Sequence, residues 1–146
     1  MRILIDGDAC PQKEDILKIA HQYFIDVILF IDYAHEVDMN RYQKVIYCDV
    51  DRDSVDSQIV KRVKENDLVI TQDYGLAGLI LSKKAKVLHL SGKMINENNI
   101  DELLFSRYAS SKMRKMNKHL KGPNKRTEED KKRFLNQLER ILKENE

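Results

Sequence analysis

Five short apolar runs, rich in β-branched residues, recur along the first ninety residues of the chain. Their side chains are apolar almost without interruption, a pattern typical of strands that are buried on both faces. The longer segments between them, at residues 11–24, 54–64 and 76–81, carry apolar side chains at helical spacing. Strands that alternate with helices predict an α/β fold, here a three-layer, doubly wound, mostly parallel sheet of five strands. The five runs lie at residues 2–6, 27–31, 45–48, 68–70 and 87–90.

The last third of the chain has a purely helical pattern. Apolar residues at positions 100–108 predict one helix, and a second helix begins at Thr127, where a cap residue is followed by acids. We therefore interpret residues 1–146 as a single domain, with an α/β core at residues 1–92 and a basic helical part at residues 93–146.

Charge is divided unevenly between the two halves, although the formal net charge is only +2. Residues 1–75 hold fifteen acids and nine bases, whereas residues 76–146 hold nine acids and seventeen bases. Residues 104–126 contain no acid and eight bases. Such blocks are compatible with two solvated faces, but they also suit a front that binds cations and a back that binds a polyanion.

Composition excludes several classes of protein. With 42% apolar residues and only seven Gly and Pro, the chain is neither collagen-like nor low in complexity. Two cysteines are too few for a disulfide framework or a cysteine-based zinc site, and no apolar run approaches the ~18 residues of a membrane span. We expect a cytoplasmic protein that does not contact membranes.

Aspartates follow three of the predicted strands. Because the carboxyl ends of parallel strands meet at one edge of a sheet, these side chains are expected to lie together there. Clustered carboxylates repel one another unless a cation neutralises them, and their hard oxygen atoms suit Mg²⁺ or Mn²⁺. Asp53 and Asp73 each precede a predicted helix, so both also fit a second interpretation as helix N-caps. The aspartates concerned are Asp6, Asp8, Asp53, Asp56 and Asp73.

A divalent ion in such a cluster supports phosphoryl-group chemistry, because it activates water and stabilises charge on a phosphate. A basic surface beside it would hold a phosphodiester backbone with little sequence preference. The sequence therefore predicts a metal-dependent nuclease-like hydrolase acting on RNA or single-stranded nucleic acid. We assign catalysis to Asp6, Asp8 and Asp73, metal binding to Asp6, Asp53, Asp56 and Asp73, and phosphate binding to Arg107, Arg114, Lys115 and Lys118.

Three stretches of the chain resemble the YaiI/YqxD family, whose function is uncharacterised and whose fold looks like that of PIN-domain nucleases. They lie at residues 6–11, 51–56 and 71–77, and Arg107 and residues 122–123 and 127–134 are also similar to the family's C-terminal part. The resemblance to PIN domains implies acids at Asp6, near Asp53 or Asp56, and at Asp73.

Two alternatives to a nuclease stay open. A non-catalytic nucleic-acid-binding or regulatory protein would use the basic region alone. A haloacid-dehalogenase-type phosphatase would use Asp6 as nucleophile and Asp8 as acid and base. The phosphatase site wants Thr or Val where this chain has Cys10.

Overall fold

The structure is a computed structural model that describes residues 1–32, 37–49, 54–116 and 125–145. Its centre is a six-stranded sheet with the order β3-β2-β1-β4-β5-β6. Strands β1 to β5 are parallel, and β6 pairs antiparallel with β5. The strands are β1 (Ile3–Asp6), β2 (Val27–Asp32), β3 (Lys44–Cys48), β4 (Leu68–Ile70), β5 (Lys86–Leu88) and β6 (Met94–Ile95).

The predicted α/β class and its five parallel strands are confirmed. The sixth strand was not predicted, because two residues are too few to show a strand period in the sequence.

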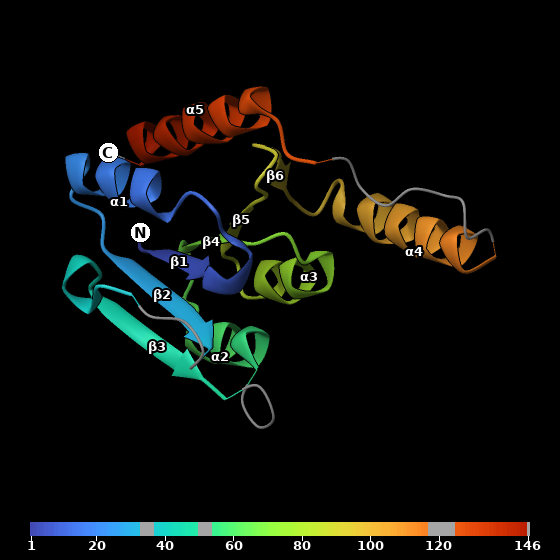
Figure 1. Cartoon of the computed structure of the whole chain (residues 1–146), viewed down its shortest axis with the longest axis horizontal. Helices are drawn as coiled ribbons and strands as arrows, with labels where there is room; N and C mark the ends of the chain where they lie inside the picture. Colours follow the sequence, from blue (N-terminus) through green and yellow to red (C-terminus); the bar gives the residue numbers. More distant parts are fainter. Residues whose placement is uncertain (33–36, 50–53, 117–124, 146) are drawn as a thin grey trace.

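The central strands are buried on both faces, as their unbroken apolar runs predicted. Because side chains alternate along a strand, Ile3 and Ile5 enter one core and Leu4 enters the other. Helices α1 (Lys13–Gln22) and α5 (Glu128–Glu144) cover the first face, and helices α2 (Val55–Arg62) and α3 (Tyr74–Ser82) cover the second (Figure 1). Short 3₁₀ turns lie at Gly7–Ala9 and Met39–Arg41.

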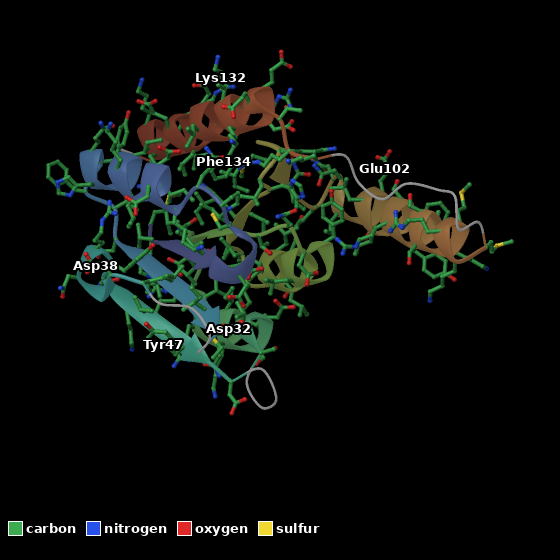
Figure 2. All side chains as sticks on the ribbon, in the orientation of Figure 1. Asp32, Asp38, Tyr47, Glu102, Lys132 and Phe134 are labelled. Carbon is green, nitrogen blue, oxygen red and sulfur yellow. The ribbon has the colours of Figure 1, made fainter. Side chains whose placement is uncertain are left out.

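The two C-terminal helices behave differently. Helix α4 (Ile100–Met116) projects away from the sheet, whereas α5 returns to it and packs beside α1 (Figure 1). Phe134 and Leu138 of α5 are fully buried in the first core. In Figure 2 Phe134 points from α5 into the body of the molecule and Lys132 points outward.

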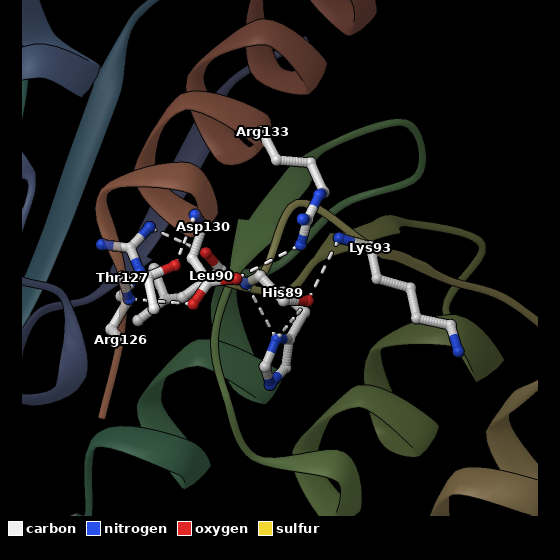
Figure 3. A network of polar contacts seen from close by, with 8 residues as sticks. His89, Leu90, Lys93, Arg126, Thr127, Asp130 and Arg133 are labelled. Carbon is white, nitrogen blue, oxygen red and sulfur yellow. Dashed lines mark hydrogen bonds and ion pairs between the residues drawn. The ribbon is translucent and has the colours of Figure 1, made fainter. Parts of the chain in front are cut away.

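The start of α5 is fixed by polar contacts with the turn between β5 and β6 (Figure 3). Thr127 and Asp130 form the predicted capping box, in which each side chain accepts a hydrogen bond from the other residue's backbone N–H. The Arg126 guanidinium donates to the carbonyl of Leu90 at 2.7 Å. Gly92 has a φ of +89°, and a Cβ there would lie 2.8 Å from the backbone of α5, so this turn requires glycine.

None of the helices in the described ranges combines the length and the apolar character that a membrane crossing needs. Both cysteines are buried thiols, and burial raises the pKa of Cys10. Cys10 and Cys48 therefore act as small core residues here.

We expect Phe134→Ala to lower the free energy of unfolding by about 3–5 kcal/mol, because it opens a cavity between α5 and the sheet. Phe24, which is 94% exposed, supplies the control. Phe24→Ala should change stability by less than about 0.5 kcal/mol in the same urea titrations. Equal losses in the two variants would contradict the packing of α5 described above.

Candidate active site

The strand order places a crevice at one defined position of the sheet. The chain runs outward from β1 through β2 to β3 and then crosses back, so that β4 pairs on the other side of β1. In open parallel sheets, ligands bind beyond the carboxyl ends of the strands at such a reversal of order. Asp6 ends β1 at this point, and Thr71 follows β4 beside it.

Asp6 is a buried carboxylate held by a neighbouring hydroxyl. Its side chain is 8% exposed, and Thr71 Oγ1 donates to Asp6 Oδ2 at 2.9 Å. Burial raises the pKa of Asp6, the Thr71 hydrogen bond lowers it, and Asp8 and Asp73 raise it, so that the net pKa lies above its usual value. The next residue, Gly7, has no room for a side chain, because a Cβ there would lie 2.6 Å from the carbonyl oxygen of Phe30.

Asp56 and Asp73 form a pair of carboxyl groups in hydrogen-bond contact. Asp56 lies in the first turn of α2, and Asp73 is the residue that caps α3. Burial, the contact with Asp73 and the charge of Asp6 together raise the pKa of Asp56 to about 6. One proton shared between two carboxylates relieves their repulsion, so the pair retains a proton at a higher pH than an isolated aspartate does.

The interpretation of Asp73 as a helix cap is confirmed, because its Oδ1 accepts from the backbone N–H groups of Gly75 and Leu76 at 2.9 and 3.2 Å. The corresponding interpretation of Asp53 is wrong, since Ser54 caps α2 by accepting from the N–H of Ser57. Asp53 itself lies outside the described residues.

A cavity of about 260 Å³ collects the acids at this edge of the sheet. Asp8 is exposed in the turn after β1, and its Oδ1 accepts from the backbone N–H of Asp32 at 3.3 Å. Asp32 ends β2, as Figure 2 shows. The cavity is lined by Asp6, Asp8, Asp32, Cys48, Ser54, Val55 and Asp56.

At the opposite edge of the sheet, the buried acid is neutralised by an arginine. Asp67 precedes β4 and is 3% exposed, and Arg2 donates to both of its carboxylate oxygens at 3.1 and 2.6 Å. Within the described ranges, no Lys or Arg forms an ion pair with Asp6, Asp56 or Asp73. Within these ranges, Asp6, Asp56 and Asp73, which we call the acidic edge, therefore share negative charge that no ion pair with Lys or Arg neutralises.

Among the described residues, no three His, Cys, Asp or Glu side chains are grouped so that they could hold a metal ion by themselves. Asp56 and Asp73 are in direct contact, and Asp6 acts on both through its charge. The structure thus brings three of the four predicted metal ligands near one another without forming a complete cage.

Three of the four predicted phosphate-binding bases, Arg107, Arg114 and Lys115, lie on the projecting helix α4. The Arg107 guanidinium carbon lies 5.9 Å from the centre of the Tyr74 ring, and Tyr74 also stacks on His89 with ring centres 5.5 Å apart. Since Tyr74 follows Asp73, this stack ties Arg107 to the acidic edge. Arg114 and Lys115 lie near the far end of α4, and Lys118 is outside the described residues.

Two residues of the site were not predicted from the sequence. Asp32 directly follows an apolar run that ends at Ile31, and it ends β2 as Asp6 ends β1, yet it was not among the predicted acids. The role of Thr71 depends on the pairing of β1 with β4, which the sequence does not specify. The end-of-strand position is the signal that could have identified Asp32.

Comparisons with known proteins identify relatives along almost the whole chain. The model of a family described as "Uncharacterized BCR, YaiI/YqxD family" matches residues 4–144. A UPF0178 protein of Natranaerobius thermophilus is 45% identical over 97% of this chain and 96% of its own length. Those of Clostridium kluyveri and Bacillus cytotoxicus are 44% and 40% identical, each over 97% of this chain and 93% and 92% of their own lengths. No solved structure matches the chain significantly.

The raised pKa of Asp56 predicts a stability that falls as pH rises. Below about pH 4 this carboxyl is protonated in the folded and the unfolded chain, but between about pH 4 and 6 only the folded chain keeps the proton. Unfolding therefore becomes easier across this window, and the loss is complete above pH 6. Because Asp56 is half-buried and water screens its repulsion, we expect about 1 kcal/mol rather than the roughly 3 kcal/mol that two pKa units would give in full.

Asp56→Asn should remove this pH dependence, since the amide imitates the protonated acid at every pH. In denaturant titrations with chelator present, the variant should exceed the wild type by about 1 kcal/mol at pH 7 and equal it near pH 4. Glu97→Gln, at an exposed turn, is the matched control and should leave the pH profile unchanged. A variant that is no more stable than the wild type at pH 7 would contradict the repulsion between Asp56 and Asp73.

Proposed function

This chain belongs to the YaiI/YqxD family of uncharacterised proteins, and from its acidic edge we propose that it is a divalent-metal-dependent nuclease acting on RNA or single-stranded nucleic acid. The observation that carries the proposal is the cavity at the strand reversal, which four aspartates line. Asp73 lies in contact with one of them, Asp56.

The donor chemistry of these residues fits Mg²⁺ or Mn²⁺. All the donors are carboxylate oxygens. The pKa values of Asp6 and Asp56 are raised, and a bound cation would lower them again. Mg²⁺ commonly binds through one or two carboxylates together with water and substrate phosphate oxygens. An incomplete protein cage is therefore compatible with an ion that binds together with the substrate.

Each acid has a separate part in this proposal. Asp56 and Asp73 would hold the ion, with Asp6 fixed beside them by Thr71. Asp8, the exposed acid of the cavity, would orient the attacking water. When bound, a divalent ion lowers the pKa of water and offsets charge on a phosphodiester. Asp53, as a further ligand, stays a prediction from the sequence.

Helix α4 supplies the surface for the nucleic-acid backbone in this proposal. Arg107 lies next to Tyr74 at the acidic edge, and Arg114 is two helical turns further on. Guanidinium groups along a helix hold phosphates with little dependence on base sequence. Lys115 and the sequence-predicted Lys118 would extend this surface.

The second candidate is a nucleic-acid-binding protein without catalysis. It is favoured by the projection of α4 away from the sheet (Figure 1), because Arg114 and Lys115 lie near the far end of this helix. We rank a phosphatase with Asp6 as nucleophile below both, because Asp6 is buried and one of its oxygens accepts from Thr71.

Calorimetric titration of Mn²⁺ and Mg²⁺ tests the acidic edge. We expect binding that tightens when a non-cleavable RNA analogue is present, and a loss of at least about tenfold in affinity in Asp6→Asn and Asp73→Asn. Asn retains the capping function at position 73, so a lost ligand is separated from a lost cap. Asp26→Asn, at the amino edge of the sheet, is the control. Metal binding that survives both site variants would refute the proposed ligands.

The same two variants distinguish the two candidate functions. A nuclease requires that they abolish metal-dependent cleavage of a single-stranded RNA while RNA binding in chelator persists. If the wild type binds RNA and does not cleave it with either metal, the non-catalytic function is supported instead.

Replacing Arg107 and Arg114 by Ala should weaken RNA binding in chelator by a similar factor for unrelated sequences. The slope of log affinity against log salt concentration should fall by about 1.4, since each phosphate contact on a single strand contributes ~0.7. The control replaces two exposed lysines that begin strands at the amino edge, Lys44 and Lys86, and removes the same charge. Equal salt slopes in the two double variants would refute a phosphate-binding role for these arginines.

A further inference from the structure

Helix α4 exposes an unusual amount of apolar surface. Ile100 is its buried residue and Leu103 is half-buried, whereas most of its later apolar side chains face solvent. Five of the seven large exposed hydrophobic residues in the described ranges lie on this helix. Exposed apolar side chains gathered on one projecting helix indicate a contact surface. The five are Leu104 (38% exposed), Phe105 (71%), Tyr108 (64%), Met113 (55%) and Met116 (80%).

The exposed aromatic residues share a face of the helix with charged residues. Residues three and four positions apart lie on one side of a helix, so Phe105 and Tyr108 align with Asp101 before them and with Lys112 and Lys115 after them. We define the α4 outer face as residues Asp101, Leu104, Phe105, Tyr108, Lys112 and Lys115.

Arg107 and Arg114 occupy a different side of the helix. They are two turns apart, and Arg107 turns back toward Tyr74. The outer face is thus separate from Arg107 and Arg114, and it shares only Lys115 with the phosphate-binding surface of the proposed function.

The charges on the outer face are ordered along its length. Asp101 lies at the start of the face, the aromatic residues occupy the middle, and the two lysines lie at the end. Asp101 is about 16–21 Å along the helix axis from Lys112 and Lys115, too far for neutralisation within one helix. If a second α4 lies antiparallel to the first, Asp101 of each helix faces the lysines of the other. The outer face is therefore electrostatically complementary to a second copy of itself.

We propose that the α4 outer face binds a second copy of this chain, with the two α4 helices packed antiparallel about a twofold axis near Tyr108. Asp101 of each copy then lies near Lys112 and Lys115 of the other, and the aromatic residues cover one another at the centre. One helix face is smaller than a standard protein interface, so self-association belongs in the micromolar range.

Exchanging the charges gives a direct test by sedimentation velocity of the full chain, without nucleic acid. The first variant is Asp101→Lys, which places one lysine opposite two lysines across the axis. The second combines Lys112→Glu with Lys115→Glu, which places one acid opposite two acids. Each variant alone should associate at least about tenfold more weakly than the wild type. An equimolar mixture should associate again, because opposite charges then meet at both ends. Circular dichroism checks that both variants retain their helices.

A pair of phenylalanine variants tests the apolar part of the surface. Phe105→Ser should weaken self-association about tenfold or more, since truncated central aromatic residues dominate interface losses. Phe24→Ser, at a more exposed phenylalanine outside α4, should not change it.

A wild type that stays monomeric at all concentrations overturns the proposal, as does a mixture of charge variants that fails to associate. If Phe105→Ser lowers RNA affinity while the wild type is monomeric, the outer face is a nucleic-acid surface instead. Metal binding and cleavage are measured in separate experiments, so the test of the proposed function does not depend on whether the chain self-associates.

Discussion

One threonine hydroxyl connects the two elements on which the acidic edge depends. Thr71 Oγ1 donates to Asp6 at the end of β1 and accepts from the backbone N–H of Asp73 at 3.1 Å. The position of a buried carboxylate and the start of α3 are therefore fixed by the same atom. Because β1 and β4 pair in register over three residues, Thr71 reaches Asp6 only in this strand order. The reversal of strand order and the acidic site therefore both depend on the pairing of β1 with β4.

Much of the α/β core could be predicted, because strands buried on both faces leave continuous apolar runs that periodicity detects. Asp6 and Asp73 were predicted from the same runs, since Asp6 ends one run and Asp73 lies three residues beyond another. Their contacts could not be predicted. Asp73 both caps α3 and contacts Asp56, and the sequence offered these as competing interpretations. A carboxylate has several acceptor positions, so one residue can serve both purposes.

The C-terminal part shows where periodicity stops being informative. Apolar residues at helical spacing predict both α4 and α5, yet Phe134 of α5 is fully buried and Tyr108 of α4 is 64% exposed. An amphipathic stripe indicates that a helix has an apolar side, but it does not indicate which surface covers that side. The geometry of the preceding turn decides, and for α5 the hydrogen bond from Arg126 to Leu90 directs the helix back onto the sheet.

The packing of α5 also has a consequence for synthesis of the chain. The helix that completes the core around β1 and α1 is synthesised long after them, and Tyr23 donates to Glu139, 116 residues later in the chain, at 3.2 Å. As the nascent polypeptide leaves the ribosome, the apolar surface of Ile16 and Leu17 stays uncovered until residues 128–144 of α5 have been synthesised. Products that end before α5 would therefore expose this apolar surface to chaperones and proteases.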